Sequence, residues 1–203
     1  MKLINTLGAL ALCVGALSSM AQTSTTRDYP NHPIKMVIPY AAGGPMDFIG
    51  RTLSPRLAQS LGQPLVIENR AGAGGAIGTD VVAKSASDGY TLLNTSSSHA
   101  SLPVVSASLP YDPIKDFTHI AMLGGPPIVL AVNAQLPIPD LKSFMAYAKA
   151  NQVSWGSPGK GTHGYLIGEA FEVMSKTPMQ HVAYKGGSPA VADTIAGHIP
   201  ALF

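Results

Sequence analysis

Residues 33–47 read PIKMVIPYAAGGPMD, an apolar run followed by a break of small residues and an acidic residue. The run from residue 33 to residue 40 is rich in Ile, Met and Val, which predicts a short buried strand. The small residues end that strand, and Asp47 predicts the cap of a helix that Gly62 terminates. A buried strand followed directly by a helix is the repeating unit of an α/β protein.

The same alternation of strand and helix continues along the rest of the chain. We expect further strands at residues 65–67, 91–93, 117–123, 128–132, 153–155, 179–183 and 199–203. Repeated strand–helix units predict mostly parallel sheets with helices on both faces. The Gly-Gly-Pro-Pro break at residues 124–127 predicts two lobes, residues 22–124 and residues 125–203. The last expected strand reaches Phe203 in an apolar run typical of a sheet interior, which predicts that the second lobe is incomplete.

The composition argues against several classes of protein. Lys and Arg number 13 against 11 Asp and Glu, and this net charge of +2 provides no electrostatic argument for a nucleic-acid partner. The single cysteine argues against a disulfide scaffold, and the six scattered histidines predict no metal site. Neither a phosphate loop nor a dinucleotide fingerprint matches in full, so we expect no cofactor.

The N-terminus is typical of a secretory signal. Met1 and Lys2 form a short positive start, residues 3–17 are mostly apolar, and Ser19-Met20-Ala21 has the pattern of a cleavage site. A membrane-spanning helix needs about 20 apolar residues, and glycine and polar residues interrupt this run. We therefore expect residues 1–21 to be a signal peptide and the protein to be periplasmic.

Four expected loops between a strand and a helix are rich in Gly, Ser, Thr or His. They are residues 41–47, 94–99, 157–163 and 184–188. Such loops collect at the carboxyl ends of parallel strands, where open α/β sheets bind ligands. Each following helix offers free backbone N–H groups and a partial positive charge, which suits a small anion such as a carboxylate. The alternative is that these loops are ordinary turns, in which glycine is common.

A catalytic role has less support in the sequence. His99 and His163 lie in two of these loops, where a histidine is either a hydrogen-bonding loop residue or a general base for a serine. The sequence has no Gly-x-Ser-x-Gly elbow, and no third orienting carboxylate stands in these loops. We therefore expect a binding protein that is not an enzyme, with a hydrolase as the less favoured alternative.

Seven stretches of the chain form a recognisable series. They include VIPYAAGG at residues 37–44, DGYTLL at residues 88–93 and YKGGSPA at residues 184–190, with the others at residues 29–34, 61–70, 72–78 and 109–117. Together they resemble the substrate-binding proteins of tripartite tricarboxylate transporters, also called the Bordetella uptake gene family. The series covers nearly all of the chain after residue 21.

The resemblance implies a periplasmic-binding-protein-like fold of two α/β lobes joined by a hinge. It implies a receptor that closes on a small organic acid and delivers the acid to the permease subunits of a membrane transporter. The same fold also suits a sensor that presents its ligand to a membrane kinase. We expect a monomer. Carried over by position, the ligand contacts fall on Gly43, Gly44, Asp47, Ser96, Ser97, His99, Ser157, Gly161, Thr162, His163, Tyr184, Lys185 and Gly186.

One stretch departs from the pattern of the resembled family. That family usually has a small residue and then Thr before the aspartate, whereas this chain has Pro45 and Met46, so the hydroxyl contact is missing. We expect Asp47 to shape the pocket without pairing with an anion, because like charges repel. Aromatic residues near the loops either stack on an aromatic acid or pack in the core or hinge; they are Tyr40, Phe48, Trp155 and Tyr184.

Overall fold

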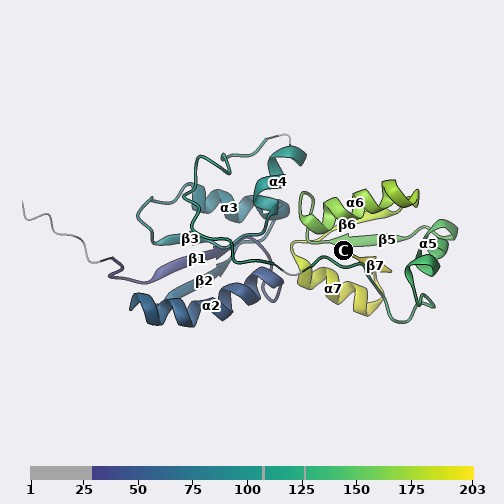
Figure 1. The fold of residues 1–203 in the computed structure, drawn as a ribbon, viewed down its shortest axis with the longest axis horizontal. Helices are drawn as coiled ribbons and strands as arrows, with labels where there is room; N and C mark the ends of the chain where they lie inside the picture. Colours follow the sequence, from purple (N-terminus) through teal and green to yellow (C-terminus); the bar gives the residue numbers. More distant parts are fainter. Residues whose placement is uncertain (1–28, 107, 126) are drawn as a thin grey trace, which may run out of the picture. The chain divides into compact units, whose positions relative to one another are not determined.

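The computed structural model describes residues 29–106, 108–125 and 127–203, and two β-sheets form within this part of the chain (Figure 1). The first sheet has the strand order β2-β1-β3, and all of its strands are parallel. Its strands are β1 (Ile34–Ile38), β2 (Leu65–Asn69) and β3 (Thr91–Leu93). Parallel pairing confirms the expected α/β class, because parallel strands need helical crossovers.

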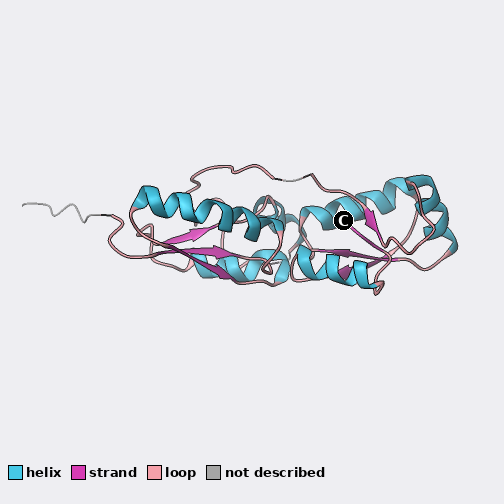
Figure 2. Cartoon of the chain, turned by 90° about the horizontal axis from the view of Figure 1, so that it is seen from below, coloured by secondary structure: helices cyan, strands magenta, loops and turns pink. Residues whose placement is uncertain are grey.

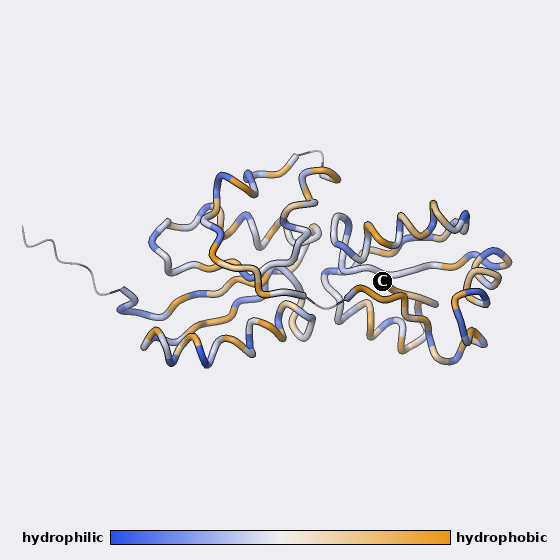
Figure 3. Tube along the Cα trace, viewed as in Figure 1, coloured by the Kyte–Doolittle hydropathy of each residue, from blue (hydrophilic) through white to orange (hydrophobic). Residues whose placement is uncertain are grey.

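The central strand β1 is buried on both faces. Every side chain of β1 except Lys35 is buried, which is typical of a parallel strand between helices. Helix α2 (Pro45–Leu61) covers one face of the sheet and α3 (Ala76–Ala83) covers the other (Figures 1 and 2). The helices alternate between apolar and polar colouring along their length in Figure 3, as expected for elements with one buried side.

The start of α2 corrects the prediction that Asp47 is its cap. The helix begins at Pro45, and the N-cap residue is Gly44. Proline suits the first helical position because its missing N–H would have no partner there. Asp47 instead stands in the first turn. The predicted end of the helix is confirmed, since Gly62 is the C-cap with φ 69° and donates its N–H to the Ala58 carbonyl.

The second sheet has the strand order β4-β7-β5-β6. The pairs β5–β6 and β5–β7 are parallel, and β4–β7 is antiparallel. Helices α6 and α7 lie on opposite faces of this sheet (Figure 1). Its elements are β4 (Ala131–Val132), α5 (Leu141–Ala150), β5 (Ser154–Ser157), α6 (His163–Ser175), β6 (Gln180–Ala183), α7 (Gly187–Ala196) and β7 (Ala201–Leu202).

Trp155 is the largest fully buried side chain of the second sheet. Its indole Nε1 donates to Glu172 Oε1 at 2.6 Å, and Phe203 packs edge-on against it with ring centroids 5.3 Å apart. Gly168 on α6 faces the indole, and a Cβ there would lie 2.2 Å from the ring. The helix therefore approaches β5 closely only because residue 168 has no side chain.

Two expectations for the middle of the chain are wrong. Residues 117–123 do not form a strand, and of the strand expected at 128–132 only Ala131–Val132 is regular. A strand needs a neighbour for its backbone groups, and the described residues give 117–123 none. The expected loop at residues 94–99 also ends early, because α4 (Ser98–Val105) begins inside it.

Other expectations stay predictions. The signal peptide, residues 1–21, lies outside the described residues. The last strand of the first sheet ends at residue 93, and the first strand of the second sheet begins at residue 131. The expected lobe boundary at 124/125 lies between them and stays a prediction. Within the described part of the chain, no helix is both long enough and apolar enough to cross a bilayer.

Candidate functional site

Four loops follow the carboxyl ends of parallel strands, and each leads into a helix. They join β1 to α2, β3 to α4, β5 to α6 and β6 to α7. Parallel strands place these loops at one edge of each sheet, where ligands bind in open α/β proteins. The first N–H groups of a helix have no partner within the regular helix and are available as donors unless the loop caps them. At α4 the loop does so, since Ser98 N, His99 N and Ala100 N donate to Ser96 or Ser97.

Hydrogen bonds join the loops of the first sheet to the loops of the second. Two of them tie the loop after β1 to the turn before α7, and two tie the region of α4 to the loop before α6. They are Ala41 N to Lys185 O at 3.1 Å, Ser188 Oγ to Ala42 O at 3.0 Å, Ser97 Oγ with His163 Nδ1 at 2.9 Å, and Ser101 Oγ to Gly161 O at 3.0 Å. The structure thus brings together all four loops that the sequence singles out.

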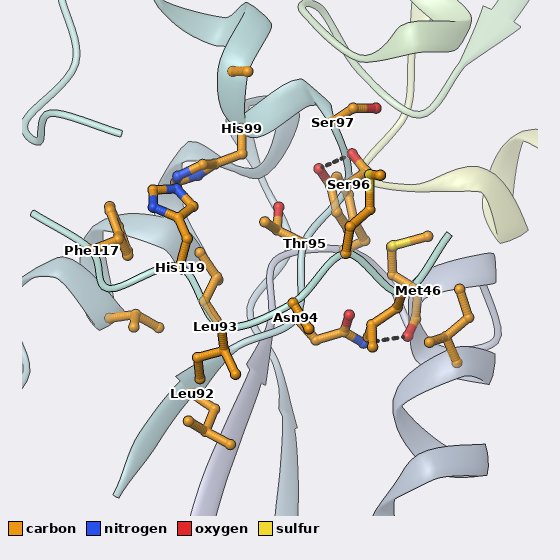
Figure 4. A pocket seen from close by; sticks show the side chains of 18 of the residues that line it. Met46, Leu92, Leu93, Asn94, Thr95, Ser96, Ser97, His99, Phe117 and His119 are labelled. Atoms are coloured by element: carbon orange, nitrogen blue, oxygen red, sulfur yellow. Dashed lines mark hydrogen bonds between the residues drawn. The ribbon is translucent and has the colours of Figure 1, made fainter. Parts of the chain in front are cut away.

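A cavity of about 1120 Å³ opens beside these loops (Figure 4). Six of the sequence-predicted residues line it: Gly44, Ser96, Ser97, His99, Thr162 and His163. Seven others stand near the loops without lining it: Gly43, Asp47, Ser157, Gly161, Tyr184, Lys185 and Gly186. The prediction therefore divides into residues that face the cavity and residues placed to support its loops.

Hydroxyl groups cluster at the start of α4. The Tyr40 hydroxyl lies 2.8 Å from Ser96 Oγ and 2.7 Å from Ser98 Oγ, and the two serine hydroxyls also bond to each other. Tyr40 and Ser98 are buried, and Ser96 lines the cavity. Each hydroxyl has one O–H, and the three mutual bonds use all three hydrogens, so the cluster donates to a carboxylate only by exchanging one of these bonds for the ligand.

The Asp47 carboxylate is committed to the protein itself. Its Oδ2 accepts from Gly43 N and from Arg51 Nε, both at 2.9 Å, and its Oδ1 accepts from Asn69 Nδ2 at 3.0 Å. Only 3% of the residue is exposed. The Arg51 hydrogen bond is the largest cause of a pKa below the usual range for Asp47. The position supports the expectation that Asp47 shapes the loop and does not meet an anion.

Few formal charges line the cavity. Among the described residues that line it, Lys115 and Asp116 carry the only Lys, Arg, Asp or Glu side chains, and they are adjacent and opposite in sign. The other polar groups are backbone amides, hydroxyls and the imidazoles of His99, His119 and His163. An anion in this cavity would therefore be bound mainly by N–H and O–H donors and by helix N-termini. The described residues also form no group of three or more His, Cys, Asp or Glu able to hold a metal ion.

His99 is held in place as a packed loop residue. Its Nε2 lies 2.8 Å from the Pro113 carbonyl, so Nε2 carries a hydrogen and donates. The ring contacts Phe117 edge-on with centroids 4.8 Å apart. Burial is the main cause that lowers the pKa of His99 below its usual value. The geometry favours a neutral imidazole with a structural hydrogen bond over a general base.

Ser97 and His163 have the separation of a nucleophile and a base, 2.9 Å, and their loops belong to different sheets. A catalytic pair also needs a group that orients the histidine, and none of the described carboxylates is hydrogen-bonded to the His163 ring. The Ser97–His163 bond is therefore described best as a tie between two loops.

Tyr184, Lys185 and Gly186 form a tight turn. The Tyr184 hydroxyl donates to Asp193 Oδ2 at 2.7 Å, and burial is the main cause that raises its pKa to about 12. Gly186 has φ 152°, and a Cβ there would lie 2.8 Å from Ala41 N. The turn therefore contributes its backbone, with the Tyr184 side chain directed to α7. Of the other aromatic residues near the loops, Trp155 is fully buried and Phe48 is 71% exposed.

Ser157, the last residue of β5, anchors the loop before α6. It is fully buried, its Oγ lies 2.7 Å from His181 Nε2, and it accepts from Gly159 N at 3.2 Å. Burial, and secondarily the charge of Lys160, lowers the pKa of His181, which favours a neutral ring hydrogen-bonded to the Ser157 hydroxyl. His181 was not among the predicted site residues, because its position within β6 gave no loop signal.

We expect His181→Ala to loosen this loop. The change removes one partly buried hydrogen bond, worth about 1 kcal/mol, so the Gly159 amide should exchange its hydrogen several-fold faster. Hydrogen–deuterium exchange resolved at this amide measures the effect. The matched control is His198→Ala, an exposed histidine that pairs with Asp193. Equal exchange at Gly159 in both variants would contradict the anchoring role.

Residues 49–203 match the family described as Tripartite tricarboxylate transporter family receptor. Among curated proteins, the chain is 40% identical over 191 residues to Protein BugT of Bordetella pertussis, a match that covers 92% of this chain and 58% of the relative. It is 35% identical to a protein of Pseudomonas sp. strain P51, covering 95% of this chain and 57% of that protein. The chain therefore spans somewhat more than half the length of these relatives.

Solved structures with a similar fold include proteins of the same kind. An R. palustris protein solved with adipate has a TM-score of 0.82 and 32% identity, covering 86% of this chain and 59% of its own. MatC from Rhodopseudomonas palustris, solved with bound malate, has a TM-score of 0.78 and 30% identity, covering 86% of this chain and 60% of its own. The periplasmic binding protein BugD has a TM-score of 0.78 at 29% identity, covering 86% of this chain and 59% of its own. The periplasmic-binding-protein-like α/β fold is thus confirmed for the matched part of the chain.

Proposed function

Since the chain belongs to the tripartite tricarboxylate transporter receptor family, we propose that it is the capture module of a periplasmic receptor for a small dicarboxylate. The family is one of solute-binding receptors, not of enzymes. The observation that carries the ligand class is the convergence of four helix-initiating loops beside a cavity with few charged side chains. Two relatives of similar fold hold dicarboxylates, adipate and malate, in their own structures.

The proposed mechanism is closure of the two lobes around the ligand. The first lobe offers the N–H groups at the start of α2 and the hydroxyl cluster around Ser96, and the second offers the start of α6. A ligand that bonds to both sets stabilises the closed state by its differential affinity. Delivery to membrane permease subunits and a periplasmic location after removal of residues 1–21 are parts of the same proposal.

Met46 is expected to influence which acid binds. It lines the cavity where the resembled family usually has a threonine, so the cavity has a thioether in place of a hydroxyl donor. A hydrogen bond of 2.8 Å, which the Asn94 side-chain Nδ2 donates to the Met46 carbonyl, fixes this turn of α2. An acid with an apolar carbon chain, such as adipate, therefore suits the cavity better than a hydroxylated acid such as malate.

A thermal-shift titration tests the proposed function. A ligand at one hundred times its Kd stabilises the folded state by about 2.7 kcal/mol, which raises the Tm of a chain of this size by about 5–10 °C. We expect adipate to give such a shift and malate a smaller one. Adipamide, which has the same length without charge, is the control ligand and should give none.

A pair of serine variants tests whether the Tm shift with adipate originates in the cavity. Ser96→Ala removes a hydroxyl from the cavity and should reduce the adipate shift, whereas Ser60→Ala on the exposed face of α2 should leave it unchanged. Equal Tm shifts with adipate and adipamide would exclude carboxylate recognition at this site. An unchanged Tm with both adipate and malate would exclude it too.

A further inference from the structure

The lysines around the second sheet carry charges that no described carboxylate neutralises. Residues 131–203 contain five lysines, no arginine and four Asp or Glu residues. None of these lysines forms an ion pair with a described residue; they are Lys142, Lys149, Lys160, Lys176 and Lys185. Every lysine of residues 29–124 is paired: Lys35 with Glu68, Lys84 with Asp80 and Lys115 with Asp112. The second sheet therefore presents positive charge that is free for a partner outside the chain.

Two of these lysines share one outer face of α5 with apolar side chains. The inner face of the helix packs Phe144 and Ala148 into the core of the second sheet. Residues three or four positions apart lie on the same side of a helix. The outer side is here named the α5 face, and it consists of Leu141, Lys142, Met145, Ala146 and Lys149. These residues line a surface depression of about 530 Å³, and Leu141 is 55% exposed. The α5 face thus combines cations with exposed apolar groups and contains no carboxylate.

Lys142 stands where the helix gains nothing from a cation. It is the second residue of α5, and the first turn of a helix carries a partial positive charge, so a lysine there is unfavourable. The nearby Asp140 carboxylate caps the helix by accepting from Ser143 N at 2.7 Å, and it forms no ion pair with Lys142. Lys149 lies in the last turn, where a cation stabilises the helix. Lys142 therefore calls for an explanation outside the helix.

We propose that the α5 face is a contact site for an anionic phospholipid surface. The two ammonium groups meet headgroup phosphates, while Leu141 and Met145 enter the boundary between headgroups and acyl chains. Lysine suits this contact because its stem covers apolar surface while its charge reaches the headgroups. The α5 face is one side of a single helix and contains no Trp, Tyr or Arg, the residues that anchor most protein–protein contacts. These features favour a lipid surface over an acidic protein.

The place of α5 in the second sheet suits such a contact. Helix α5 leads into β5 and lies at the amino edge of that sheet, whereas the loops before α6 and α7 lie at the carboxyl edge (Figure 1). A lipid surface on the α5 face therefore leaves these loops open to a ligand. Each lysine near an anionic surface raises the affinity by about fivefold, so two lysines and two apolar side chains give a weak, reversible contact.

Vesicles of defined composition test this inference. Vesicles of phosphatidylglycerol and phosphatidylcholine in equal parts should slow hydrogen exchange at the amides of α5 and leave those of α2 unchanged. Vesicles of phosphatidylcholine alone should slow neither, and added salt should weaken the effect because it screens the lysines. Unchanged exchange at α5 with the anionic vesicles would overturn the proposal. Protection of α5 by soluble polyglutamate, with none by the vesicles, would overturn it too, because the partner would then be an acidic polypeptide.

Two double variants remove the same charge from different faces. Lys142→Gln with Lys149→Gln should lower the affinity for the anionic vesicles about tenfold or more, measured by co-sedimentation. The matched control, Lys35→Gln with Lys84→Gln, changes the net charge equally and should bind as the native chain does. Residues 1–21 are the same in all three proteins, so a difference between them reports the substitutions.

Equal losses of vesicle binding in the two double variants would overturn the proposal, because binding would then follow net charge and not the α5 face. Circular dichroism of each variant checks its fold. None of the four substituted lysines lines the cavity, so the Tm shift with adipate should be the same in both double variants. The vesicle test and the dicarboxylate titration can therefore fail independently of each other.

Discussion

Replacing Trp155 with alanine is expected to lower the free energy of unfolding by about 3–5 kcal/mol, the range for a large aromatic side chain in a core. The indole is fully buried between α6, β6 and the end of the chain at Phe203. Removal of the indole leaves a cavity next to Gly168, which lies directly against the ring and has no side chain to fill the space. The Glu172 carboxylate also loses the Nε1 donor, although it keeps the Met179 N–H at 3.0 Å.

Urea unfolding followed by far-ultraviolet circular dichroism measures this loss. The control is Val173→Ala on the same helix, where the side chain is exposed and the expected change is within about 0.5 kcal/mol. The reverse substitution, Gly168→Val, forces side-chain atoms into the indole and should be destabilising as well. A loss of less than about 1 kcal/mol in Trp155→Ala would mean that the sheet repacks around the vacated space.

Replacing Asp47 with alanine is expected to weaken dicarboxylate binding by about 10- to 100-fold. The carboxylate holds Gly43, Arg51 and Asn69, and hydrogen bonds to charged groups are worth about 1.5–3 kcal/mol each. Without it, the Gly43 N–H loses its acceptor and the loop before α2 loses its fixed shape. Titration calorimetry with adipate measures the affinity, and exchange of the Gly43 amide measures the loop.

A matched control for Asp47 is Asp80→Ala. Asp80 forms the same type of pair, with Lys84 one helical turn later, but it does not line the cavity. Its loss should leave the affinity for adipate unchanged. Weaker binding in Asp47→Ala with an unaltered Gly43 amide would point to direct contact between Asp47 and the ligand, contrary to the closed set of partners around it.

The stabilisation that the Asp47 carboxylate provides through its hydrogen bonds depends on pH. The folded-state pKa lies below the ordinary value of about 4, mainly because of the Arg51 hydrogen bond. The unfolded chain therefore takes up the proton first as the pH falls. The stabilisation is complete above about pH 5 and is lost as the pH falls through the lowered folded-state pKa. The stability difference between the native chain and Asp47→Asn should shrink in that range.

Local signals predicted most of the regular structure. The strand at residues 33–40 and the helix end at Gly62 depend on residues next to one another, and both are confirmed. The start of α2 was misassigned because two cap signals compete, and Pro45 outweighs Asp47. Helix α4 was missed because serines, β-branched residues and Pro103 make a poor helix by propensity.

Features that depend on distant partners were not accessible from the sequence. Residues 117–123 have the composition of a strand, but a strand exists only beside a neighbour. The loops of the site could be located by the rule for parallel sheets, while the bonds from Tyr40 to Ser96 and Ser98 depend on the tertiary fold. Gly74 is a further example, since a Cβ there would lie 2.2 Å from the Lys160 carbonyl, a contact that no local pattern indicates.

Trp155 also makes one of the two sheets optically distinguishable from the other. It is the single tryptophan in the sequence, so intrinsic indole emission originates in the second sheet alone. The His181 ring lies with its centroid 4.5 Å from the indole, close enough for protonation of the imidazole to quench that emission. Fluorescence thus follows β5 and its surroundings selectively, whereas circular dichroism sums both sheets. The difference between the two signals reads out whether the sheets unfold together or one after the other.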